Sequence, residues 1–183
     1  MRFRSSRQGV VADVDAVEAH VLARCAEDLL TLLGEDDDTD TDIAQDPLAA
    51  LVGLAPEPVE APTDPALARL LPDAYGDDDP DANREFRRYT DADLRAGKRA
   101  HAGVVLATLR DGGGRLVLDR DQAVAWLGFL NDLRLVMGTR LEVTEETDPD
   151  ALPDDDPRLP ALQVYGWLGW LQETLVSSLS PRR

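Results

Sequence analysis

Cysteine, histidine and lysine are all scarce in this chain of 183 residues, which contains a single lysine, Lys98. The only cysteine is Cys25, which excludes an intramolecular disulfide and a cysteine-rich metal site. The two histidines, His20 and His101, lack the spacing of a histidine metal motif. We therefore expect no metal and no cofactor.

Long apolar runs are also missing. No stretch approaches the roughly 18 apolar residues of a membrane-spanning helix. The arginine-containing start has no apolar segment of signal-peptide length. We expect a soluble cytoplasmic protein without membrane contact, folded as one domain over 1–183, because a chain of this length can bury a sizeable core.

Positive charge is the third shortage. There are 36 acidic residues against 19 lysines and arginines, for a net charge of -17. Such a surface repels nucleic acid unless basic residues are segregated. Direct DNA binding is therefore the less favoured alternative to contact with a protein.

The longest dense apolar run covers 123–141 and has the spacing of a helix. Asp119 or Asp121 is suited to cap its start, and Gly138 to end it. The predicted apolar face consists of Trp126, Leu127, Leu130, Leu133 and Met137.

Helical spacing recurs over 13–34, 82–110 and 162–179, with shorter helices at 47–54 and 66–71. We predict that the first helix buries Val14, Val17, Val21, Cys25, Leu29 and Leu32. Thr90 and Asp91 resemble an N-cap that divides the stretch 82–110 into two helices.

Short strands are predicted near 2–5, 9–12 and 115–118, the last two each before an aspartate-capped helix. If these strands pair, a small antiparallel sheet connects the N-terminus to the middle of the chain. The predicted fold class is mainly α, with a minor β element.

Three acidic runs near 35–46, 73–81 and 142–156 separate these elements. Their low hydrophobicity and dense like charge are typical of solvated segments. We predict that they are mobile loops.

The last helix contains two tryptophans, Trp167 and Trp170, on the apolar face that Val164, Leu168, Leu171 and Leu175 also mark. Aromatic side chains in this pattern usually pack in a core. We expect this helix to pack against the central helix. A homodimer or partner surface is the alternative.

Basic residues are concentrated at one place only, the stretch 82–110. We call the set Arg84, Arg87, Arg88, Arg95 and Arg99 the arginine surface. One interpretation is that local ion pairs neutralise these arginines. The other is that they form a docking surface for an acidic partner or a nucleic-acid backbone.

Catalytic groups are sparse. Nucleophilic catalysis would need Cys25 and a histidine within reach of each other, but His20 lies five residues away on the same helix, at a poor angle. His101 lies on an apolar helix face, where a packed histidine is expected. We therefore predict no enzyme activity and no catalytic residues.

Three segments carry a resemblance to a known family: MRFRSSRQGVVADVD at the start, LNDLRLVMGTRL at 130–141 and YGWLGWLQETLV at 165–176. Together they resemble an actinobacterial family catalogued mainly as a domain of unknown function. It includes the oxidative-stress transcriptional regulator AosR, and its genes commonly lie near that of the Clp adaptor ClpS. The family-motif residues are Asn131, Asp132, Arg134, Gly138, Thr139, Arg140, Tyr165, Trp167 and Trp170.

The resemblance implies a cytoplasmic regulator of transcription in stress response that contacts a sigma factor or RNA polymerase. The disulfide-based redox sensing of that family requires two thiols, which this chain lacks. The alternative is a non-catalytic adaptor or structural protein-interaction module unrelated to transcription.

Overall fold

A computed structural model describes residues 1–34, 59–75, 79–110, 112–153 and 155–180. The acidic run 35–46 and the helix predicted at 47–54 lie outside these residues. The described elements are β1 (Arg4–Ser6), β2 (Gly9–Val14), α1 (Ala16–Leu33), α4 (Pro65–Leu70), α5 (Pro80–Thr108), β3 (Gly114–Leu118), α6 (Arg120–Arg140), the short 3-10 helix η2 (Pro149–Ala151) and α7 (Leu159–Leu179). The predicted mainly α fold with a small antiparallel sheet is confirmed.

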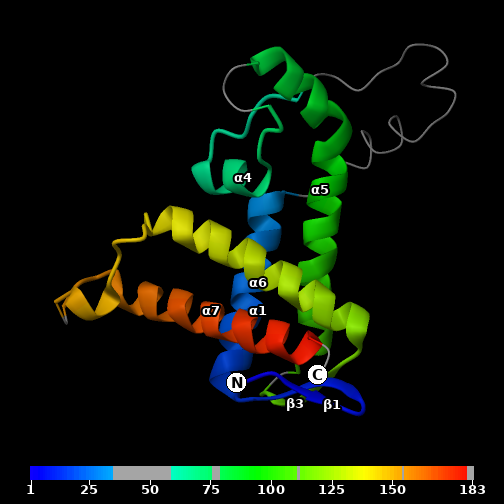
Figure 1. The fold of residues 1–183 in the computed structure, drawn as a ribbon, viewed down its shortest axis with the longest axis vertical. Coiled ribbons are helices and arrows are strands. Elements are labelled where there is room, and N and C mark those ends of the chain that lie inside the picture. Colours follow the sequence, from blue (N-terminus) through cyan, green and yellow to red (C-terminus); the bar gives the residue numbers. More distant parts are fainter. Residues whose placement is uncertain (35–58, 76–78, 111, 154, 181–183) are drawn as a thin grey trace, which may run out of the picture.

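The helices are arranged around α6 (Figure 1). Helix α7 packs beside α6, as predicted, and runs antiparallel to it, while α6 crosses α1 and the long helix α5. Helix α4 packs on the opposite side of α6 from α7, and the sheet lies at the end of the molecule where α1 begins and α5 ends. The N-terminal turns of α5 extend beyond the other helices.

The sheet has the strand order β1-β2-β3, with both pairs antiparallel. Val11 lies opposite Arg4 on β1 and opposite Val117 on β3. The predicted pairing of the N-terminus with the middle of the chain is therefore confirmed, although β1 begins two residues later and β2 ends two residues later than predicted.

Local sequence sets the helix starts. Asp15 and Glu18 form a reciprocal capping box at α1, and Asp119 and Gln122 form one at α6. The predicted cap at Asp119 is correct, and Asp121 lies in the first turn.

The predicted ends of two helices were wrong. Helix α6 continues past Gly138 to Arg140, because this glycine stays helical and lies against the ring of Tyr165, 3.4 Å from where its Cβ would be. Helix α5 is continuous through Thr90 and Asp91. Asp91 is buried and pairs with Arg95 instead of capping a second helix.

The predicted buried face of α1 was wrong in part. Val17 is 72% exposed, whereas Ala19, Leu22 and Ala26 are buried. The sequence suggested that the valines face the core because their side chains are larger than those of the alanines. In the folded chain, the small alanines face inward, where they allow close packing against the other helices.

The acidic runs also differ in part from the predicted loops. Asp79 accepts a hydrogen bond from the backbone of Ala82 and caps α5, so the helix begins inside the run predicted as the loop 73–81. The run 142–156 contains the short helix η2. Mobility of the acidic runs stays a prediction.

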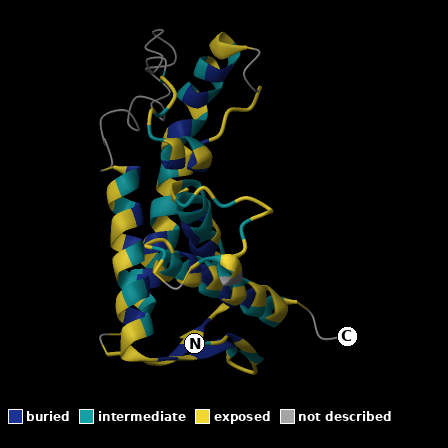
Figure 2. Ribbon diagram, turned by 90° about the vertical axis from the view of Figure 1, so that its left-hand side faces the viewer, coloured by how far each residue is buried: buried dark blue, intermediate teal, exposed yellow. Residues whose placement is uncertain are grey.

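The core lies where α6 crosses α1 and α5, as the concentration of buried residues in Figure 2 shows. Trp126, Phe129 and Leu130 of α6 are all fully buried. The ring of Phe3 meets Trp126 edge to face, with centroids 5.7 Å apart. The N-terminal segment is thereby attached to the centre of the helical core.

Two helical glycines provide a matched test of packing. A Cβ at Gly128 would lie against the ring of His101, whereas a Cβ at Gly97 would meet no atom within 4 Å. We expect Gly97→Ala to stabilise the protein by about 0.5–1 kcal/mol. Gly128→Ala is expected to destabilise it by about 1–3 kcal/mol, since the ring must move. Urea unfolding measures both, and equal effects of the two changes would show that α5 and α6 do not meet at His101.

Candidate functional site

Two members of the arginine surface pair with neighbours on or beside α5. Arg84 makes ion pairs with Asp81 and Glu60, and Arg88 with Glu85 at 3.2 Å. Arg88 also lies over the ring of Tyr89, 5.5 Å from its centroid. These contacts satisfy much of the charge that a partner would have to use.

Arg87 is a buried member of the same set. Its guanidinium pairs with Asp73, which holds the described end of the second acidic run against α5. Because Arg87 is buried, pulling its side chain away from these contacts to bind a partner would disturb the fold.

Arg95 and Arg99 act on the end of α1. Both donate to the carbonyl oxygen of Leu33, at 2.8 and 3.4 Å, where the last helical carbonyls lack partners within the helix. Arg95 also pairs with Asp91. The arginine surface therefore joins α5 to its surroundings, and its role in partner binding stays a prediction.

Arginines whose side chains make no ion pair or hydrogen bond with a described residue lie elsewhere. Five of these arginines belong to the sheet or to the segments that enter and leave it. We call them the sheet-end arginines: Arg2, Arg7, Arg110, Arg115 and Arg120. Each of them is exposed. A sixth, Arg69, is on α4.

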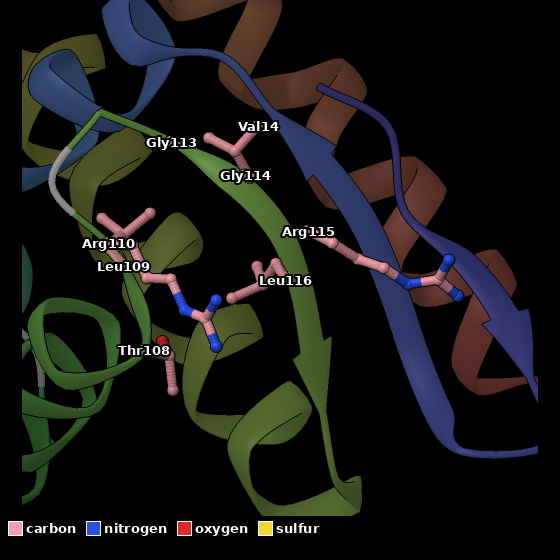
Figure 3. Close-up of a pocket in the computed structure, with 8 residues that line it drawn as sticks. All are labelled: Val14, Thr108, Leu109, Arg110, Gly113, Gly114, Arg115 and Leu116. Carbon is pink, nitrogen blue, oxygen red and sulfur yellow. The ribbon is translucent and has the colours of Figure 1, made fainter.

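The hollow beside β3 shows two of these side chains (Figure 3). Arg110 points along the hollow toward Leu116, while Arg115 extends over the sheet toward β2. The hollow is lined by Val14, Thr108, Leu109, Arg110, Gly113, Gly114, Arg115 and Leu116. None of the described residues that line it carries a carboxylate, although Asp13 on β2 lies opposite Arg115 in the strand register.

The family-motif residue Asp132 is buried and joins α6 to α5. It accepts a hydrogen bond at 2.7 Å from Lys98, the only lysine of the chain, and forms an ion pair with it. Its neighbour Asn131 is exposed. Asp132 therefore connects two helices rather than contacting solvent.

Arg134 and Tyr165 form a polar contact between α6 and α7, and Gly138 lies against the Tyr165 ring. Arg134 donates to Gln172 at 2.7 Å and to the Tyr165 hydroxyl at 3.4 Å. Its guanidinium also lies 5.2 Å from the centroid of the Tyr165 ring, an arrangement that favours a cation–π contact. These motif residues fix the antiparallel pair of helices.

The end of α6 is joined to α4 by Arg140, which pairs with Asp64 at 2.7 Å. The backbone N–H of Leu67 is the largest cause that lowers the pKa of Asp64, and Arg140 adds to it. Thr139 donates to the carbonyl of Leu135 within α6. Both motif residues thus have structural contacts.

The tryptophans of α7 differ in burial. Trp167 is partly buried and lines an apolar groove with Val17 and Val164, whereas Trp170 is 42% exposed. The prediction that Trp170 belongs to the core was wrong, because Leu168, Leu171 and Leu175 already fill the buried face of α7.

The candidate reactive groups are dispersed. Burial and Asp28 raise the pKa of the Cys25 thiol, while Arg24 lowers it by less, so the thiol form is favoured. His101 lies against α6, and His20 is exposed. The described residues contain no group of three or more histidine, cysteine or acidic side chains that could hold a metal ion. Among the described helices, none has the length and apolar character needed to cross a membrane.

These observations define a mainly α-helical domain with a small antiparallel sheet, in which most motif side chains join helices. The chain belongs to the family described as domain of unknown function DUF2017, whose model matches residues 1–179. No solved structure matches it significantly.

The chain is similar to proteins described as the oxidative stress regulator AosR. Those from Mycobacterium tuberculosis and Mycobacterium bovis are each 37% identical over 194 aligned residues, which cover 100% of this chain and 84% of the relative. An AosR relative from Mycobacterium leprae is 33% identical over 175 residues, which cover 89% of this chain and 80% of that protein.

Proposed function

We propose that this protein is a cytoplasmic regulator in the response to oxidative stress. The observation that carries the proposal is the similarity to the oxidative stress regulators over the full length of the chain. The chain carries one cysteine, so a disulfide within one molecule is not part of this role.

The proposed mode of action is control of transcription through contact with a sigma factor or RNA polymerase. The net charge of -17 opposes a close approach to DNA, since phosphates meet like charge over most of the surface. Positive charge free to meet an acidic protein is found at the sheet-end arginines. Two of them lie at β3, because Arg115 is part of the strand and Arg110 is beside it (Figure 3).

Charge reversal distinguishes this surface from the arginine surface. Arg110→Glu with Arg115→Glu is expected to weaken capture of purified sigma factors or core RNA polymerase at least about tenfold, because like charges then face each other. Arg84→Glu with Arg88→Glu is expected to change capture little, since both side chains already pair within the chain. The Arg84 and Arg88 pair is also the matched control for net charge, and Arg69→Glu adds a single reversal at another exposed arginine. Surface plasmon resonance measures the affinities.

The outcome also separates the alternatives. Capture that is lost only with the Arg84 and Arg88 pair would move the interface to the arginine surface. An undiminished capture by every arginine variant, together with loss on Trp170→Ala, would move it to α7. Failure of every sigma factor and of RNA polymerase to bind would favour an adaptor unrelated to transcription. Salt-sensitive binding of duplex DNA by the purified protein would favour direct DNA contact.

A further inference from the structure

The strand β3 has an edge with unpaired backbone groups. In the order β1-β2-β3, its other side has no neighbouring strand among the described residues. The carbonyl oxygens of Leu118 and Val14 lie close to Gly9 and Gly113, which are the chain neighbours of their register partners Val10 and Gly114. Backbone groups alternate in direction along a strand. The N–H and C=O groups of Arg115 and Val117 therefore point away from β2.

No backbone hydrogen bond joins these outward groups of Arg115 and Val117 to another described residue. Both residues are exposed, and Val117 is 43% exposed. The opposite edge differs, because the N–H of Phe3 donates to Thr174 at 3.3 Å and α7 covers part of β1. Proteins commonly cover or shorten such edges to prevent pairing with other chains. At β3, no strand and no backbone hydrogen bond from the described residues covers the edge, although residues 108–110 line a hollow beside the strand.

Charge identifies the occupant. Arg115 is on β3 itself, Arg110 lies beside the strand, and Arg120 follows the strand after Asp119. All three are exposed and make no ion pair with a described acid. A second copy of this chain would bring a large like charge to the edge, and a duplex offers no extended backbone for the outward N–H and C=O groups.

We infer that β3 binds an extended, acidic segment of a partner protein as a fourth antiparallel strand. The partner backbone pairs with the outward groups of Arg115 and Val117, its carboxylates meet Arg110, Arg115 and Arg120, and an apolar side chain covers Val117. This inference rests on the proposed function only in requiring a protein partner.

The probe is a synthetic peptide of roughly nine residues, about the length of a long strand, in which glutamate and valine alternate. Its binding to the full chain is measured by fluorescence anisotropy and is expected to be saturable. An otherwise identical peptide with lysine in place of glutamate is expected not to bind. No transcription component is present, so failure of this assay leaves the proposed function intact, while failure to bind a sigma factor or polymerase leaves the strand pairing intact.

Val117→Pro tests the backbone contact directly. Proline removes one outward N–H without removing a bond of the β2–β3 pair, and we expect the peptide affinity to fall at least about tenfold. Val117→Ala controls for the side chain. Ser5→Pro, which removes the outward N–H of the other edge strand, should leave the affinity unchanged. Melting curves by circular dichroism confirm that each variant folds.

Arg115→Glu tests the charge, with Arg69→Glu as the matched control. We expect only the first to weaken binding. Loss of binding in Arg115→Glu but not in Val117→Pro would overturn strand addition in favour of contact between charges alone. Equal binding of the lysine peptide would overturn the acidic partner, and a dimer that Val117→Pro dissociates would show that a second copy occupies the edge instead.

Discussion

Leu130→Asp is expected to unfold the protein under conditions in which the unchanged chain is folded. Leu130 is fully buried on α6, at the crossing with the other helices, among Trp126 and Phe129. A carboxylate placed there would lie within the apolar core that the described residues form, and burying an unpaired charge costs several kcal/mol or more. Typical domains have a total stability of about 5–15 kcal/mol. One change of this size therefore removes most or all of the stability.

The control for this change lies on the same helix. Val124 is 48% exposed, so Val124→Asp adds the same charge to α6 without burying it. We expect it to lower the melting temperature only slightly, because surface substitutions usually change stability by about 0.5 kcal/mol or less. Thermal melts followed by circular dichroism measure both variants. A cooperative melt of Leu130→Asp at the temperature of the unchanged protein would exclude the burial of Leu130.

The second large effect is expected at the buried ion pair between Lys98 and Asp132. Lys98→Met removes the cation and leaves the carboxylate of Asp132 buried between α5 and α6 without its partner. Breaking a buried pair in this way is expected to cost about 3–5 kcal/mol. The free energy of unfolding in urea measures the loss.

The double variant tests whether the cost comes from the isolated charge. Adding Asp132→Leu to Lys98→Met replaces both charges with apolar side chains, and we expect most of the stability to return, since apolar replacements of buried pairs are often neutral or stabilising. If Lys98→Met alone left the free energy of unfolding unchanged, the burial of the Asp132 carboxylate would not require this lysine. If the double variant were as unstable as the single one, the cost would lie in packing rather than in charge.

The local sequence determined the elements of this fold. The spacing of apolar residues predicts α6 and α7. Asp15 caps α1 and Asp119 caps α6 through contacts that reach only three residues along the chain. The strands β2 and β3, which precede α1 and α6, were also predictable, because they are short segments that contain the β-branched residue valine. The burial of Leu130 follows from the same periodicity.

Tertiary structure decided which face of each helix is covered. Val17 and Trp170 are also apolar, but the buried face of α1 is formed by alanines and leucines, and that of α7 by its leucines. Continuity of α5 through Asp91 likewise depends on Arg95, which engages both this aspartate and the end of α1. Periodicity along one helix contains no information on which direction a neighbour takes.

For the candidate site, too, the sequence locates the charged residues, whereas only the fold shows which of them are paired. Sequence alone locates the arginines of 82–110 as the densest basic stretch, and it also offers ion pairing as one explanation. Only the fold shows that Arg87 meets Asp73 and that Arg95 and Arg99 reach Leu33. In the sheet, Asp13 on β2 pairs with Arg4 and lies in register with Arg115 on β3, although these two arginines are more than a hundred residues apart in the chain. Whether a charge is paired or free depends on distances through space, which a linear sequence does not contain.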